Sequence, residues 1–123
     1  VYHHEGVDMV INEPRNGNPT IILAMGPGKI VTYKNHYGGY SGKMITIDHG
    51  NGIKTLYIHL DQLQSTLSLG SYVAGGQVLG TGGRSLAGRW DGTVPHLHFG
   101  LRFNNVYCDP TPLFASWNGG KKA

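Results

Sequence analysis

Short apolar runs separated by glycine-containing turns recur along the chain, and no helical period extends beyond about two turns. The runs occupy residues 20–24, 29–33, 43–48, 55–60, 71–73, 77–79 and 96–103. Between them stand the turn signals Gly26-Pro27-Gly28, Gly38-Gly39, Gly50-Asn51-Gly52, Gly75-Gly76 and Gly82-Gly83. Strands with this punctuation predict an antiparallel all-β domain. Two short helices are expected at residues 61–67 and 112–117, and a surface loop at residues 84–94.

The run at residues 96–103 alternates strictly. On a strand, alternate residues share a face. One face is apolar and predicts a core contact, with Leu97, Phe99, Leu101 and Phe103. The other face carries His96 and His98, whose positions are about 6.5–7 Å apart along a strand. One imidazole can then bind a metal ion while the other handles a proton.

The run at residues 55–60 supplies a further histidine. Alternation predicts Leu56, Ile58 and Leu60 on one face and Thr55, Tyr57 and His59 on the polar face. His59 ends this run. If the two runs belong to one sheet, His59 can project beside His96 and His98.

His4 and Asp8 form a third candidate group, in the segment His4-Glu5-Gly6-Val7-Asp8, which reads as a turn or an irregular strand. Zinc accepts imidazole nitrogen and carboxylate oxygen, and a catalytic zinc has three protein ligands and an open position. His4, Asp8 and one histidine of the His96/His98 pair make such a set. Each feature alone is common in proteins without a metal, so the hypothesis depends on their joint occurrence. Three other histidines, His3, His36 and His49, are interpreted as solvated or structural.

Composition restricts the class of protein. Hydrophobic residues make up 39% of the 123 residues and charged residues 14%, which is typical of a globular chain. We interpret residues 1–123 as a single domain, mature or excised from a longer chain, and we expect a monomer. Cys108 is the only cysteine, so an intrachain disulfide is excluded. The net charge of +3 suits an anionic partner such as a cell wall. Neither a nucleic-acid surface nor a membrane span is expected.

The motifs occur together in an order that resembles the lysostaphin/LytM-type zinc endopeptidases. The resemblance runs from His4 to about Arg102. It is carried by His4-Glu5-Gly6-Val7-Asp8, Ile45-Thr46-Ile47-Asp48-His49-Gly50-Asn51-Gly52, Thr55-Leu56-Tyr57-Ile58-His59-Leu60, Val73-Ala74-Gly75-Gly76-Gln77-Val78-Leu79-Gly80 and Pro95-His96-Leu97-His98-Phe99. Where family members often have Glu after the last motif, Gly100 stands here.

The resemblance implies that His4, Asp8 and His98 bind one Zn²⁺ per chain, and that His59 and His96 are the catalytic histidines. It implies a two-layer antiparallel fold with a substrate groove over the larger sheet, for which Tyr37, Tyr40 and Trp90 are candidate walls. The implied activity is hydrolysis of peptide bonds in bacterial peptidoglycan, in the cross-bridge or the stem peptide. That substrate implies an extracytoplasmic location (secreted, periplasmic or wall-associated) or a place on a phage virion, as in antibacterial lysins.

Two other functions share part of this pattern. A domain of the same fold can bind peptidoglycan or activate another hydrolase without catalysis, although such a domain normally lacks one of the five site residues. A carrier domain of the biotinyl or lipoyl type has a hairpin similar to residues 73–80, but Gly75-Gly76 stands at the turn where a carrier has lysine. A carrier also gives no reason for His4 and Asp8.

Overall fold

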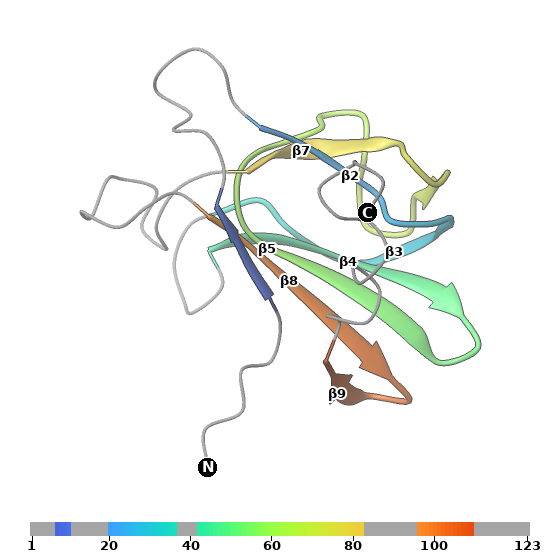
Figure 1. Cartoon of the computed structure of the whole chain (residues 1–123). Coiled ribbons are helices and arrows are strands. Elements are labelled where there is room, and N and C mark those ends of the chain that lie inside the picture. Colours follow the sequence, from blue (N-terminus) through green and yellow to red (C-terminus); the bar gives the residue numbers. More distant parts are fainter. Residues whose placement is uncertain (1–6, 11–19, 37–41, 83–95, 110–123) are drawn as a thin grey trace, which may run out of the picture.

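The structure is a computed structural model that describes residues 7–10, 20–36, 42–82 and 96–109. Their regular elements are all strands, which confirms the predicted all-β class (Figure 1). They are β1 (Val7–Val10), β2 (Ile21–Leu23), β3 (Gly28–Lys34), β4 (Lys43–Gly50), β5 (Ile53–Leu63), β6 (Tyr72–Val73), β7 (Val78–Gly82), β8 (His96–Phe103) and β9 (Val106–Cys108).

The strands form a curled antiparallel sheet. Its main path runs β1-β8-β5-β4-β3-β6, with β9 added to β8. The 11-residue strand β5 pairs with β4 and β8, and its last part pairs with β7, which in turn pairs with β2. Figure 1 shows β2 and β7 folded over one side of β3, β4 and β5. Because β5 belongs to both parts, the sheet closes into two layers.

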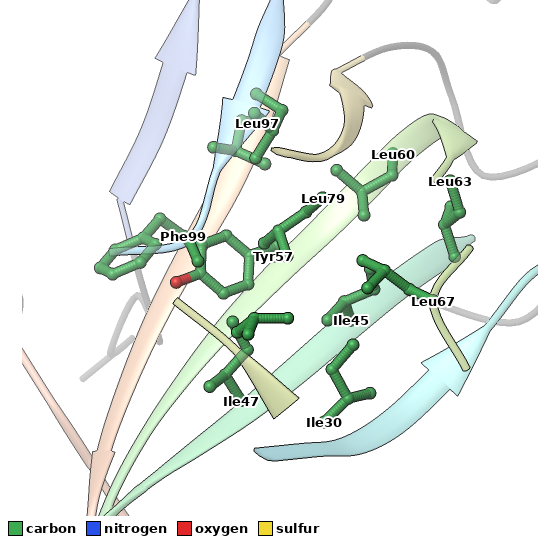
Figure 2. Packing of buried hydrophobic residues seen from close by; sticks show 13 residues of the cluster. Ile30, Ile45, Ile47, Tyr57, Leu60, Leu63, Leu67, Leu79, Leu97 and Phe99 are labelled. Atoms are coloured by element: carbon green, nitrogen blue, oxygen red, sulfur yellow. The ribbon is translucent and has the colours of Figure 1, made fainter. Parts of the chain in front are cut away.

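The hydrophobic core lies between these layers (Figure 2). Alternate residues of β4 supply its centre, since Ile45 and Ile47 are fully buried, as are Ile30 of β3 and Leu79 of β7. Burying an aliphatic side chain of this size stabilises the fold by about 1.5–3 kcal/mol. The remaining members are Ile22, Ala24, Tyr57, Leu60, Leu63, Leu67, Val73, Leu97 and Phe99.

The backbones of β7 and β5 come very close together where these two strands pair. A Cβ atom at Gly80 would overlap the backbone carbonyl of Gln62, so only glycine fits there. Gly80 is paired with Leu63 and Ile22, one residue in each neighbouring strand. The approach lets the β2–β7 pair cover the core.

The expected helix at residues 61–67 was wrong. Residues 61–63 continue β5, because Leu63 pairs with Gly80 and the Gln64 amide donates to the Leu79 carbonyl at 2.8 Å. The helix expected at residues 112–117 and the loop at residues 84–94 lie outside the described residues.

The predicted apolar face of residues 96–103 is only partly in the core. Leu97 and Phe99 belong to the core, whereas Phe103 is 50% exposed. Figure 1 shows the end of β8, next to β9, well away from β2 and β7. The second layer therefore does not cover this end of the strand.

Candidate functional site

The five predicted site residues are described to different extents. His59 and His98 are described with their side chains, and both are half-buried. Asp8 and His96 are described through the backbone of β1 and β8. His4 lies outside the described residues, as do the candidate groove walls Tyr37, Tyr40 and Trp90.

Strand β1 sets Asp8 directly across from His98. The antiparallel register pairs Val7 with Phe99, Asp8 with His98, Met9 with Leu97 and Val10 with His96. Directly opposed residues of an antiparallel pair share one face of the sheet. Since Leu97 and Phe99 belong to the core, the positions of Asp8 and His98 lie on the face turned away from it. The segment expected to be a turn or an irregular strand thus ends in a regular strand, from Val7 onward.

A β-bulge sets the position of His59. Strand β4 pairs Met44 with Ile58 and Lys43 with Leu60, so His59 is an extra residue in β5. Its φ angle is 68°, in the left-handed region that β-strand residues with a side chain rarely adopt. Bulges of this kind redirect a side chain and are frequent next to active sites.

Because of the bulge, the faces predicted for the residues of β5 were wrong. Tyr57 and Leu60 are both core residues, although strict alternation would put them on opposite faces. Tyr57 pairs with Phe99, and Ile58 pairs with His98. Ile58 therefore lies on the His98 face, while Tyr57, predicted on the polar face beside His59, faces the core. Without knowledge of the bulge, the sequence of β5 does not show whether Ile58 or Tyr57 faces the core, because both side chains are largely apolar.

The imidazoles of His59 and His98 come together on adjacent strands. Their ring centroids are 6.2 Å apart and the ring planes meet at 74°. The two histidines are 39 positions apart in the chain, as their numbers give. The pair is thus assembled by the β5–β8 pairing and by the bulge together.

Below this pair, the core contains a polar group. The Tyr57 side chain is 2% exposed, and its hydroxyl contacts the Thr55 hydroxyl at 2.8 Å. Burial raises the pKa of the Tyr57 phenol above its ordinary value, and hydrogen bonds with Thr55 and Met25 oppose part of that shift. Because Thr55-x-Tyr57 alternates like the surface face of a strand, the sequence does not reveal that this pair is buried.

The other histidines differ in environment. His49 lies on β4 at a second register shift of the β4–β5 pair, and hydrogen bonds join its ring to the Pro27 carbonyl and to the hydroxyl of Thr55, a buried residue of the core face. His36 is exposed, and His3 lies outside the described residues. His49 is therefore on the opposite face of the sheet from His98.

The described residues contain part of the predicted metal-binding set. Within the four described ranges, no group of three His, Cys, Asp or Glu side chains is arranged to hold a metal ion. The first predicted ligand, His4, is outside these ranges, so the complete set is not among the residues searched. In the same ranges, no helix has the length and apolar character needed to cross a membrane.

Residues 2–110 match the family described as Peptidase family M23. The DD-carboxypeptidase/endopeptidase Mpg of Neisseria meningitidis serogroup B is 36% identical over 110 residues, covering 89% of this chain and 22% of that protein. The peptidoglycan DD-endopeptidase ShyA of Vibrio cholerae is 35% identical over 94 residues, covering 72% of this chain and 20% of that protein. The chain thus spans about a fifth of the length of these relatives.

Solved structures share the fold. The antimicrobial peptidase lysostaphin from Staphylococcus simulans aligns with a TM-score of 0.74 and 31% identity, over 98% of this chain and 47% of that one. A zinc-containing peptidase from Vibrio cholerae aligns with a TM-score of 0.63 and 29% identity, over 85% of this chain and 28% of that one. The curled antiparallel sheet is therefore an arrangement that these peptidases have in common.

Proposed function

The chain belongs to peptidase family M23, and from this premise we propose that it is a zinc-dependent endopeptidase that hydrolyses peptide bonds in bacterial peptidoglycan. One observation carries the proposal: Asp8 is directly opposed to His98 in the backbone register, and the His59 ring lies 6.2 Å from the His98 ring. Segments far apart in the chain thus meet at one face of the sheet. The name of the relative ShyA, a peptidoglycan DD-endopeptidase, supports the substrate class.

His4, Asp8 and His98 would hold one zinc ion per chain. The fit is chemical and topological, because two imidazoles and a carboxylate suit Zn²⁺, and Asp8 and His98 are cross-strand neighbours. The similarity to a zinc-containing peptidase supports this choice of metal. When bound, zinc supplies the Lewis acidity that makes water a better nucleophile and polarises a peptide carbonyl.

The remaining chemistry belongs to the two other histidines. His96 lies two positions before His98 on β8, and we assign it the role of general base that accepts a proton from the attacking water. His59 would donate a hydrogen bond to the developing oxyanion and a proton to the leaving amine. Two histidines with opposite protonation tasks can divide the acid and base steps of peptide hydrolysis between them.

The substrate class implies a setting for the protein. Peptidoglycan peptides lie outside the cytoplasm, so the domain would act in an extracytoplasmic compartment, as a monomer. Both cross-bridge and stem-peptide bonds belong to the proposed substrate class. Peptidoglycans that differ in bridge type distinguish the two, because mass spectrometry of the released fragments identifies the bond that was cut.

The proposed activity is tested by digestion of purified peptidoglycan with and without a chelator. We expect soluble fragments in the presence of Zn²⁺ and none after chelation, with activity restored by added zinc. His36→Ala is the matched control, because it removes an exposed histidine outside the site. A zinc-loaded protein that binds every peptidoglycan type but releases no fragment would instead identify a non-catalytic binding or activating domain.

Metal content separates the ligands from the catalytic histidines. His4→Ala, Asp8→Ala and His98→Ala should lose both zinc and activity, whereas His96→Ala and His59→Ala should lose activity and keep about one zinc per chain. Zinc is measured by atomic emission on the purified variants. A His96→Ala protein without zinc would contradict the assignment of roles.

A further inference from the structure

A chain of hydrogen bonds crosses the core face of the sheet beneath the His59–His98 pair. The Met25 amide donates to the Tyr57 hydroxyl at 3.0 Å, and that hydroxyl contacts Thr55 Oγ1 at 2.8 Å. Thr55 Oγ1 lies 2.6 Å from His49 Nε2, and His49 Nδ1 lies 2.7 Å from the Pro27 carbonyl oxygen. Thr55 and Tyr57 are each only 2% exposed. This chain of hydrogen bonds connects the turn before β3 with strands β4 and β5.

The two ends of this chain define its direction. The Pro27 carbonyl can only accept, so His49 Nδ1 carries the hydrogen, and in a neutral imidazole Nε2 is then an acceptor. The Met25 amide can only donate, so the Tyr57 oxygen accepts from it. Tyr57 therefore donates to Thr55, and Thr55 donates to His49 Nε2. Each buried hydroxyl is satisfied once as donor and once as acceptor, which is the arrangement a buried polar group requires.

Tyr57 connects this chain to the candidate site. Its ring packs edge-on against Phe99, with centroids 5.5 Å apart and planes at 69°. Phe99 follows His98 directly, and Tyr57 precedes the bulged His59 by two positions. Figure 2 shows the Tyr57 and Phe99 rings together at one end of the core. One anchored ring thus lies beneath both strands that carry the histidine pair.

The bulge explains why such an anchor is needed. His59 is the extra residue of the bulge, opposite the step from Lys43 to Met44 of β4, and its φ angle is 68°. A backbone in the left-handed region persists only where the surrounding structure determines it. On the amino-terminal side of the bulge, that surrounding structure includes Ile58, which is paired with both neighbouring strands, and Tyr57, with its two hydrogen bonds and its contact with Phe99.

We propose that His49, Thr55 and Tyr57 are positioning residues, whose hydrogen-bonded chain holds Tyr57 against Phe99 and thereby sets the bulged His59 relative to His98 for catalysis. None of the three has to contact substrate, because they lie on the core face. The inference rests on the proposed function, since it assumes that His59 acts in peptide hydrolysis. A displacement of about 1 Å in a catalytic group can lower the rate up to about 100-fold.

The test compares Thr55→Val and Tyr57→Phe, which remove one hydroxyl each and preserve shape, with Thr55→Ser, which restores the hydroxyl. We expect the kcat of both hydroxyl-deleted variants on a peptidoglycan-derived peptide to fall about 10- to 100-fold, with KM within about twofold. Thr55→Ser should recover kcat to within about threefold of the parent chain. Zinc content should stay at about one per chain, because His59 is not a ligand in the proposed set.

Two further variants separate positioning from a loss of stability. Leu79→Ala removes a fully buried side chain from the same core and lowers stability without touching the chain of hydrogen bonds. It should keep the parent kcat at a temperature where all variants are folded. The double variant Thr55→Val/Tyr57→Phe should lose no more than about twice the kcat factor of the worse single variant, because both changes interrupt one chain.

Nuclear magnetic resonance gives a readout that does not need activity. The ring resonances of His59 in the zinc-loaded protein should move in Thr55→Val and Tyr57→Phe and stay unchanged in Leu79→Ala. Unmoved His59 signals, or a parent-like kcat in both hydroxyl-deleted variants, would overturn the positioning role. An inactive parent chain whose His59 signals still respond in this way would instead count against the proposed function and leave the structural link established.

Discussion

The backbone of His59 is strained in a way that a glycine at the same position would not be. A left-handed conformation costs a residue with a Cβ atom about 1–2 kcal/mol, and His59 has a φ angle of 68°. The other residues with a side chain that have positive φ in the described ranges are Asn51, Asn104 and Asn105, of the residue type that tolerates this region best. Backbone preference therefore does not explain a histidine at the bulge, whereas the catalytic role proposed for His59 would.

This strain predicts opposite rankings for stability and activity. His59→Ala keeps the Cβ atom in the left-handed region, whereas His59→Gly relieves it. We expect the glycine variant to have a free energy of unfolding about 1 kcal/mol above that of the alanine variant. Both variants should be inactive because both lack the imidazole. Urea unfolding of the two proteins measures the difference, and an alanine variant at least as stable as the glycine variant would contradict a strained bulge.

Tyr57 gives stability a dependence on pH in the alkaline range. Its pKa is raised by burial above the ordinary value of 10.0. Well below that pH, the phenol is protonated in both the folded and the unfolded chain, so its contribution is fully present. Above about pH 10, the unfolded chain loses the proton first, so the free energy of unfolding falls until the folded pKa is passed.

The prediction is that Tyr57→Phe removes this alkaline decrease. At neutral pH the variant should be about 1–3 kcal/mol less stable than the parent, because the Met25 amide and the Thr55 hydroxyl lose a buried partner. The gap should narrow as the pH rises above 10. Denaturant unfolding between pH 8 and pH 11 measures it, with Tyr72→Phe, at a tyrosine that is 76% exposed, as the control. If the free energies of unfolding of the parent and of Tyr57→Phe depend on pH in the same way, Tyr57 is not the cause of the alkaline decrease.

Among the elements, the two hairpins at the end of the sheet depend on each other. The β4–β5 turn has positive φ at Gly50, Asn51 and Gly52. The β8–β9 turn has positive φ at Asn104 and Asn105, which is the geometry of a two-residue hairpin loop. The Asn104 amide donates to the Gly52 carbonyl at 2.8 Å, so the two turns are held side by side.

Alanine in the β4–β5 turn tests this contact. Gly50→Ala introduces a Cβ atom at φ 86° with no heavy atom within 4 Å, so we expect only the conformational cost, about 1–2 kcal/mol. Gly52→Ala adds, at φ 81°, an overlap with the Asn104 side chain and should cost more. Thermal unfolding of both variants measures the difference. If the overlap is responsible, Asn104→Gly should recover part of the loss in the Gly52→Ala background; equal losses in the two glycine variants would contradict it.

At this scale, the sequence predicts strands better than their faces. The runs at residues 29–33, 43–48 and 96–103 became β3, β4 and β8 because apolar and β-branched residues in them are bounded by glycine turns. β9 was missed, although Asn104-Asn105 is a hairpin signal. The faces of β5 were assigned wrongly because one inserted residue, His59, reverses the alternation after it. A bulge depends on the partner strand, and a single strand's sequence does not contain that partner.

For the candidate site too, the features set by one strand were predictable from the sequence, and those set by contacts between strands were not. Histidines His96 and His98 alternate on one strand, so their shared face follows from local geometry. That Asp8 is opposed to His98 is a matter of long-range register, which the sequence motifs suggested only through the family resemblance. The support beneath the site was not predictable, because His49, Thr55 and Tyr57 meet through the core and not along the chain.

In the whole molecule, β1 is connected to the rest of the described sheet through β8 alone, whereas β4 and β5 are paired on both sides. If zinc binds His4, Asp8 and His98 together, the metal cross-links this edge strand to β8, in addition to the backbone hydrogen bonds between the two strands. Binding to the folded state alone stabilises it, by about 1.4 kcal/mol for each tenfold excess of zinc over the dissociation constant. Removal of the metal should then loosen β1 more than the centre of the sheet.

We predict that chelation lowers the melting temperature and selectively loosens β1. Amide hydrogen exchange should speed up at Val7–Val10 by at least about tenfold when zinc is removed, while the amides of Ile45 and Ile47, in the fully buried centre of β4, change only with the global stability.

Asp8→Asn is the matched control, since it keeps the size of the side chain and weakens the proposed metal site. Its exchange at β1 should be fast with or without zinc. Equal acceleration in β1 and β4 of the parent chain would mean that the metal stabilises the fold as a whole, and no acceleration in β1 would mean that zinc is not held between β1 and β8.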